Sequence, residues 1–125
     1  MLGDHEATAT VAVRSLKAAR RFYEDTLGFK VLHTEGDGAV SYEAGKGELL
    51  VYQSEFAGTS KATVATWTVP DVESVVRDLA AKGIRFEHYE LPKTTRKGDV
   101  HLAGHLKLAW FKDPDGNIHA LVGVS

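Results

Sequence analysis

The amino-acid sequence predicts an α+β protein in which two consecutive βαβββ modules set eight strands around a shared concavity. Apolar residues alternate with a period of two along several short segments and follow a helical period along two others. The order of these segments occurs twice in the 125 residues. Short glycine-containing turns separate the expected strands. The modules, residues 7–55 and 62–124, are expected to form one domain spanning residues 1–125, which is an ordinary length for a single domain.

The first module begins with an alternating segment at residues 7–13, which is typical of a strand. Ser15 is expected to cap a helix that runs to about Leu27, because apolar residues then recur at helical spacing. Gly28 supplies the stop signal at the end of that helix. Three further strands, separated by Gly-Asp-Gly and Gly-Lys-Gly turns, are expected at residues 29–35, 39–44 and 48–54.

The second module repeats this order. It starts with an expected strand at residues 63–69, continues with a helix capped by Asp71, and reaches a helix stop at Gly83. Three more strands are expected at residues 84–89, 106–112 and 117–124.

A long connection at residues 91–104 carries the basic residues Lys93, Arg96 and Lys97. Long loops of this kind often act as lids, and these three side chains could neutralise an anionic ligand at the mouth of a site. The alternative is a solvated basic loop without a ligand.

The composition excludes several classes of function. There are 15 Lys and Arg and 17 Asp and Glu, a net charge of −2, which gives no reason to expect nucleic acid or an anionic membrane as a partner. The chain has no cysteine, so disulfides, zinc–thiolate sites and thiol catalysis are excluded. No signal peptide or membrane-spanning segment is recognisable, and a cytoplasmic location is therefore expected.

The period-two alternation predicts which side chains face the concavity. In the first expected strand Thr8 and Thr10 point away from the helix. In the corresponding strand of the second module Val64 and Thr66 do so, whereas Trp67 packs under the helix.

The segment AWFKDPDGNIHAL predicts a hairpin, since proline fixes φ, and aspartate, asparagine and glycine favour a tight turn. A four-residue turn at 113–116 would place Phe111 and Ala120 on the concave face. Trp110 and His119 would then share the opposite face.

Pairing across the hairpin of the first module adds Tyr42, Val51 and His33 to the concave face, and the internal repeat makes His88 the equivalent of His33. An apolar cavity with a few polar groups is typical of a small-molecule site. The alternative is that these faces close on each other as ordinary core. His33 or His88 could act as a general base or bind a ligand, or be a satisfied, partly buried histidine. Tyr42 and Phe111 could stack on a planar ligand or be core aromatics.

The segments AVRSLKAARRFYEDTLGF and AWFKDPDGNIHAL resemble the vicinal oxygen chelate superfamily. This superfamily includes glyoxalases, extradiol dioxygenases, fosfomycin resistance enzymes and bleomycin resistance proteins. The resemblance extends over about residues 7–123. It implies an open, cup-shaped, eight-stranded barrel and a homodimer.

Metal enzymes of this family carry His, Gln or Glu on inner strands. The matching points here are Thr8, Val51 or a neighbour, Val64 and Ala120, and none offers an imidazole or a carboxylate. The sequence is thus expected to hold no metal and no cofactor, and it is similar to the metal-free bleomycin resistance branch. That branch implies binding of a small, partly apolar or aromatic metabolite or antibiotic, with drug sequestration as the concrete form.

The alternative function is a lyase, isomerase or dioxygenase with its metal held by other ligands, or a metal-free reaction that uses one of the inward histidines. His101, His105 and His119 could form a different metal site, or be loop and surface histidines. The expected ligand-binding residues are Thr8, Thr10, His33, Tyr42, Val51, Val64, Thr66, His88, Phe111 and Ala120.

Overall fold

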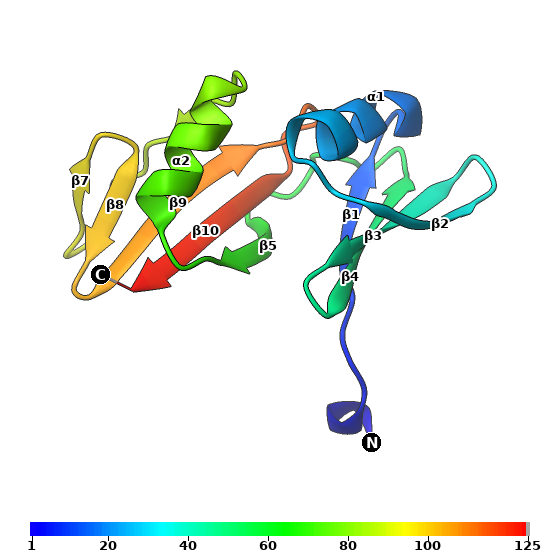
Figure 1. Ribbon diagram of the computed structural model, residues 1–125, viewed down its shortest axis with the longest axis horizontal. Helices are drawn as coiled ribbons and strands as arrows, with labels where there is room; N and C mark the ends of the chain where they lie inside the picture. The colour runs from blue at the N-terminus through cyan, green and yellow to red at the C-terminus, as the bar shows by residue number, and fades with distance from the viewer. Residues whose placement is uncertain (125) are drawn as a thin grey trace. The chain divides into compact units, whose positions relative to one another are not determined.

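The computed structural model describes residues 1–124 and has a mixed α+β fold, with mostly strands and two α-helices (Figure 1). This confirms the α+β class. The chain divides into two compact units. The first contains residues 1–64 and the turn residues 114–117, and the second contains residues 65–113 and the chain from Ile118 onwards. Ser125, the last residue of the expected domain, lies outside the described residues.

The first unit contains one sheet and one helical segment. Its sheet has the strand order β1-β4-β3-β2. The elements are a short 3₁₀ helix η1 (Leu2–Asp4), β1 (Ala9–Val13), α1 (Leu16–Arg20), a π-helix η2 (Arg21–Thr26), β2 (Val31–Glu35), β3 (Ala39–Ala44) and β4 (Gly47–Gln53).

The second sheet runs in the order β5-β10-β9-β8-β7, and β6 also pairs with β9. In both sheets the first strand lies beside the last one. The elements are β5 (Thr63–Thr68), α2 (Val72–Ala81), β6 (Phe86–Glu87), β7 (Thr95–Lys97), β8 (Val100–Ala103), β9 (Leu106–Lys112) and β10 (Ile118–Val124).

Both helices begin where the sequence predicts. The Ser15 hydroxyl accepts a hydrogen bond from the backbone N–H of Ala18 at 3.2 Å, and the Asp71 carboxylate accepts one from the N–H of Ser74 at 3.1 Å. The first helix widens into the π-helix η2, so the N–H of Leu27 donates to the carbonyl of Phe22, five residues back. The sequence does not predict this widening.

The connection expected at residues 91–104 is not a simple loop. It forms a hairpin of β7 and β8, in which Arg96 lies opposite His101. Conversely, the strand expected at residues 84–89 shortens to β6. Alternation does not reveal β7, because its three residues, Thr95 to Lys97, are all polar and exposed.

Ten strands therefore replace the eight expected, and no closed barrel is found within residues 1–124. No helix in this part of the chain is long and apolar enough to cross a membrane.

Helix α2 covers one face of the second sheet, where it packs on β8, β9 and β10 (Figure 1). A Cβ atom added at Gly123 would lie 2.9 Å from a methyl group of Val72, and the ammonium group of Lys107 pairs with Glu73 of α2. Gly123 and Lys107 are also opposite each other in the β9–β10 ladder. The odd-numbered residues of β9 and β10 thus face the helix, and the even-numbered residues form what we call the distal face.

The helical segment of the first unit covers its sheet in the same way. The rings of Tyr23 in η2 and Tyr42 in β3 stack with centroids 6.1 Å apart, and the N–H of Leu16 donates to the Gln53 side chain at 3.3 Å. The register pairs Tyr42 with Leu49 and Val40 with Val51, as expected. All four of these strand side chains are fully buried in the core.

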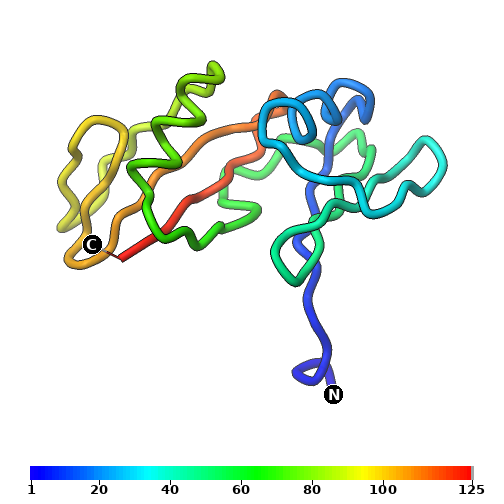
Figure 2. Tube along the Cα trace, in the orientation of Figure 1, coloured from blue at the N-terminus to red at the C-terminus, as the bar shows by residue number. Residues whose placement is uncertain are grey.

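The hairpin between β9 and β10 is the orange and red part of the trace in Figure 2. Its connection has five residues, 113–117, because Lys112 lies opposite Ile118. The four-residue turn expected from the sequence is therefore wrong. Asn117 does not join the strand, since its buried side chain donates a hydrogen bond to the carbonyl of Ala12 at 2.7 Å. Asp115 accepts a hydrogen bond from the N–H of Arg14 at 3.3 Å.

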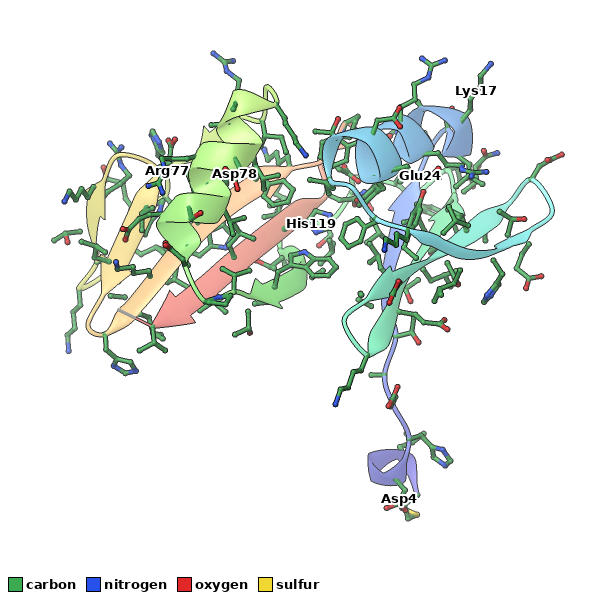
Figure 3. The ribbon with its side chains drawn as sticks, viewed as in Figure 1. Asp4, Lys17, Glu24, Arg77, Asp78 and His119 are labelled. Atoms are coloured by element: carbon green, nitrogen blue, oxygen red, sulfur yellow. The ribbon has the colours of Figure 1, made fainter. Side chains whose placement is uncertain are left out.

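The one-residue change in register moves every β9 side chain to the other face. Phe111 lies opposite His119 on the helix-covered face, and their rings stack with centroids 5.1 Å apart. Trp67 of β5 stacks on the other side of His119 at 6.1 Å, and Phe86 of β6 meets Phe111 edge-on at 5.9 Å. These four rings form an aromatic row across β5, β10, β9 and β6, in which His119 is labelled in Figure 3.

Candidate ligand-binding site

Three of the expected ligand-binding residues do not face a cavity. Tyr42 and Val51 are completely buried beneath the helical segment of the first unit. Phe111 is 2% exposed and belongs to the aromatic row under α2. Their expected position on the concave face is wrong for two reasons. The hairpin of the first unit turns its apolar face to the helix, and the five-residue turn reverses β9.

The other expected residues lie away from the helices or outside the strands. Thr10 and His33 are on the distal side of the first sheet, since Thr10 pairs with Leu50, His33 with Ser41, and Ser41 with Leu50. Thr66 and Ala120 alternate with the helix-facing residues of their strands, as expected, and Val64 is half-buried. Thr8 precedes β1 and is exposed, and His88 follows β6 and pairs with Asp99 at 2.8 Å. The ten residues thus lie in two units and on both sides of the sheets.

The strand positions that match the metal ligands of the family's enzymes carry no metal-binding side chains here. Val51 faces the helical segment, so its neighbours Leu50 and Tyr52 occupy the distal side of β4. Together with Val64 and Ala120, they offer neither imidazole nor carboxylate. Among residues 1–124, no three His, Asp or Glu side chains gather closely enough to hold a metal ion. These residues do not fit the metal centre of the family.

The alternative site of His101, His105 and His119 is also contradicted. His101 lies opposite Leu108, which is on the distal face, whereas His119 lies in the aromatic row on the helix-covered face. The sheet itself separates the two imidazoles.

A cavity of about 250 Å³ opens where β6 and β8 follow one another along the same edge of β9. It lies entirely within the second unit. Its lining is formed by the segment after β6, by β7 and by one residue of β8, namely Tyr89, Glu90, Leu91, Thr94, Thr95, Arg96 and His101.

His101 closes the gap between the two strands. Its Nε2 accepts a hydrogen bond from the backbone N–H of Tyr89 at 3.0 Å. The imidazole thus replaces the carbonyl of a neighbouring strand as the acceptor for this N–H. The ring is fully buried, and its Nδ1 has no hydrogen-bond partner in the described chain. Burial lowers the pKa of His101, the nearby charges of His88 and Arg96 lower it further, and the backbones of Tyr89 and Leu108 oppose the change.

Two aromatic rings support this imidazole. Trp110 meets His101 edge-on with centroids 4.9 Å apart, and Tyr89 meets Trp110 edge-on at 5.2 Å. The phenol oxygen of Tyr89 is buried and, like His101 Nδ1, has no hydrogen-bond partner in the described chain. Burial raises the pKa of Tyr89, and the charge of Glu87 raises it further, so the phenol keeps its proton at neutral pH.

A larger cleft of about 590 Å³ lies in the first unit, between α1 and the turn at Gly36 and Asp37. Its central polar groups already bind one another. Glu24, labelled in Figure 3, accepts hydrogen bonds from Arg20 at 2.5 Å and from the Tyr42 hydroxyl at 2.8 Å. The hydrogen bond with Arg20 is the main reason that the pKa of Glu24 lies below its usual value. This network needs no ligand, which distinguishes the cleft from the cavity at His101.

The sequence does not single out Tyr89, His101 and Trp110 as a group. The expected four-residue turn puts Trp110 on the helix side, which is wrong, and His101 lies in a segment expected to be a loop. The one available signal is the concentration of aromatic and histidine residues at 86–89 and 110–111, on either side of that segment, with His101 inside it.

Comparisons with known proteins agree with this fold. A family model described as the Glyoxalase/Bleomycin resistance protein/Dioxygenase superfamily matches residues 5–121. The comparison with curated proteins gave no significant match.

Among solved structures, the chain is similar to a glyoxalase family protein from Enterococcus faecalis, with 21% identity, a TM-score of 0.73, and 98% of this chain and 99% of that chain covered. It is similar to lactoylglutathione lyase from Agrobacterium tumefaciens, with 17% identity, a TM-score of 0.70, and 95% and 92% covered. It is also similar to an antibiotic binding protein from a Streptomyces species, with 17% identity, a TM-score of 0.66, and 97% and 98% covered. At such identities the likeness concerns the fold alone. Because the family model spans most of the chain, the protein belongs to the Glyoxalase/Bleomycin resistance protein/Dioxygenase superfamily, as the sequence motifs predict.

Proposed function

We propose that the protein binds a small, partly apolar or aromatic molecule, without a metal, in the cavity formed by Tyr89, Leu91, Arg96 and His101. The observation that carries this proposal is the pair of buried polar atoms beside the cavity, His101 Nδ1 and the Tyr89 hydroxyl, that lack a hydrogen-bond partner. A buried polar group without a partner costs about 1–3 kcal/mol of folding free energy. A ligand that supplies the partners would recover this cost as binding free energy.

The size of the cavity indicates the size of the ligand. A volume of about 250 Å³ is slightly below the roughly 300–1,000 Å³ typical of drug-sized sites, so a molecule with a single ring is the best fit. A larger antibiotic would have to extend along the distal face of the sheet, where Ala120 and Thr66 lie on the strands beyond Trp110. We include these two residues as proposed ligand-facing positions of the second unit. Thr10 and His33, on the distal side of the first sheet, are proposed separately as ligand-facing positions of the first unit.

Binding without catalysis is favoured over the enzymatic alternative by the chemistry of the donors. The similarity to a lactoylglutathione lyase concerns the fold. The strand positions that would hold a metal carry Leu, Tyr, Val and Ala side chains instead of imidazoles or carboxylates. The similar antibiotic binding protein illustrates a binding role on the same fold.

The experiment is a calorimetric and thermal-shift titration of the protein with single-ring aromatic compounds of different polarity. The Thr94→Trp variant, which fills the cavity, should abolish any stabilisation by ligand. Thr34→Trp, on the exposed strand β2, is the matched control and should leave it unchanged. If no compound binds, or if Thr94→Trp binds as well as the wild type while folded by circular dichroism, the proposed site is wrong.

Elemental analysis of protein purified without chelators separates the two function classes. The proposal expects much less than one divalent metal ion per chain. One tightly bound ion per chain would support the enzymatic alternative instead.

The homodimer is part of the same proposal. β2 is an edge strand whose five residues are all exposed, including Val31 at 40% and Leu32 at 47%. Exposed apolar side chains on a free edge favour pairing with another chain. Sedimentation equilibrium should show a dimer that Leu32→Lys weakens, and a wild-type monomer at micromolar concentration would contradict this.

A further inference from the structure

We infer that the molecule bound at His101 carries a hydrogen-bond acceptor, in the form of an aromatic carboxylate, and that the site rejects amines of the same shape. This inference rests on the proposed function and specifies the chemical class of its ligand. It depends on which polar groups at the cavity are donors, on how they are held, and on the charge around them.

The hydrogen bond to Tyr89 determines the tautomer of His101. Since Nε2 accepts the backbone N–H at 3.0 Å, the proton of the neutral imidazole must be on Nδ1. The unpartnered Nδ1 is therefore a donor. Trp110 packs edge-on against the ring, and β8 holds its backbone between β7 and β9, so the ring cannot easily turn over to exchange its nitrogens.

The second unpartnered group is also a donor. The Tyr89 hydroxyl keeps its proton, because burial disfavours the phenolate. A ligand ammonium group offers no acceptor to either of these donors: the Tyr89 oxygen can accept from it, but the proton on His101 Nδ1 stays unpaired. A carboxylate has two acceptor oxygens and can bind both donors.

Charge at the cavity does not oppose this class. Arg96 is the cation among the lining residues, and its Nη1 also donates to the carbonyl of Gly98 at 2.7 Å. The nearby Glu87 pairs with Lys112 at 3.4 Å, which offsets its charge. Glu90 is the carboxylate in the lining. Arg96 and Glu90 are both exposed, so solvent screens the two charges and they largely offset each other, and the buried donors set the preference for an acceptor.

Neither donor atom has solvent-accessible surface. A ligand can therefore reach them only when side chains at the cavity move. Binding is therefore expected to be slower than simple diffusion would allow.

The test compares benzoate, benzyl alcohol and benzylamine, which share a ring but differ in the polar group. Calorimetry at neutral pH should show that benzoate binds most tightly, benzyl alcohol less tightly and benzylamine least tightly. Benzoate should bind at least about tenfold more tightly than benzylamine, because hydrogen bonds to a charged acceptor are the stronger ones. Equal binding of the three compounds, or preference for the amine, would overturn the inference and leave the proposed function intact. Binding of none of them would overturn the proposed function itself.

Variants assign the effect to the donors. Tyr89→Phe should lower the affinity for benzoate about tenfold and that for benzyl alcohol less, whereas Tyr52→Phe, on a strand of the first unit, should change neither. Arg96→Gln changes an exposed side chain, so it retains the fold and should also weaken benzoate selectively.

A nitrogen-15 spectrum of the free protein tests the tautomer directly. Its histidine resonances should show His101 protonated at Nδ1. A proton on Nε2 would overturn the inference whatever binds.

Discussion

Replacing His119 with phenylalanine should remove a pH dependence of folding stability that the wild-type protein shows below neutral pH. His119 is fully buried between Phe111 and Trp67, and its Nδ1 lies 3.1 Å from the indole nitrogen of Trp67. Because the indole nitrogen always carries its proton, His119 is the acceptor, and its Nδ1 must be unprotonated. Burial lowers the pKa of His119 from 6.5 to about 4, and the charge of Asp113 only partly opposes this.

The sign and size of the effect follow from proton linkage. In the unfolded chain the imidazole binds a proton near its ordinary pKa of 6.5, whereas in the folded protein it does so only near 4. The unfolded state therefore binds more protons between these values, and stability decreases as the pH falls through this range. His119 contributes its full stability above about pH 6.5, and about 2 kcal/mol of it should be lost by about pH 5.

The assay is urea unfolding of the wild type and His119→Phe at several pH values from about 7.5 to 5. The difference between their free energies of unfolding should shift by about 2 kcal/mol in favour of the variant as the pH falls. His5→Gln, at an exposed histidine, should follow the wild type. A constant difference between wild type and His119→Phe would refute the reasoning, and His119→Gln repeats the test if phenylalanine prevents folding.

Three further substitutions test the packing. Tyr42→Phe removes the hydrogen bond from its hydroxyl to Glu24 and should cost about 1–2 kcal/mol in urea unfolding, and no loss would contradict a role for this bond. Asn117→Ala removes the buried hydrogen bond to β1 and should cost about 1–3 kcal/mol, measured in the same way, while Asn117→Asp should not restore it. Gly58→Ala would force a methyl group onto the Asp115 carbonyl oxygen at a φ of +70° and should cost about 2 kcal/mol or more of unfolding free energy. Such a loss should lower the melting temperature by many degrees. Gly36→Ala, with φ +54° and open space around it, should cost clearly less, and equal losses would show that the close approach at Gly58 does not matter.

The sequence predicts the local structure well where one strong signal determines it. Ser15 and Asp71 are short polar residues followed by apolar residues at helical spacing, and both cap helices as expected. The glycine-rich turn of the first unit places β3 at the predicted residues with the predicted register. The α+β class follows from these signals.

The faces of the strands are harder to predict, because they depend on tertiary contacts. Whether the DPDGN turn has four or five residues depends on Asn117, whose side chain binds the Ala12 carbonyl more than a hundred positions earlier in the chain. Nothing local indicates this contact. A single residue of turn length then decides whether Phe111 or Trp110 faces the helix.

The candidate site is beyond sequence reasoning for a related reason. His101 matters because β6 ends early and leaves the N–H of Tyr89 in need of an acceptor. Strand ends are the least regular part of a pattern, and β7 has no alternation at all. The pairing of β6 and β8 with β9, which no local pattern indicates, brings these residues together.

The turn at residues 113–117 also has a consequence for protein synthesis. Asn117 and Asp115 complete the first unit through contacts with Ala12 and Arg14, residues that leave the ribosome about a hundred positions earlier. Closing so long a chain segment is slow compared with forming a local helix or hairpin. While the ribosome is still adding the middle of the chain, the nascent first sheet lacks this support, and its exposed edge strand β2 is available to other chains. Expression conditions that slow translation are thus expected to lengthen the period in which aggregation competes with folding.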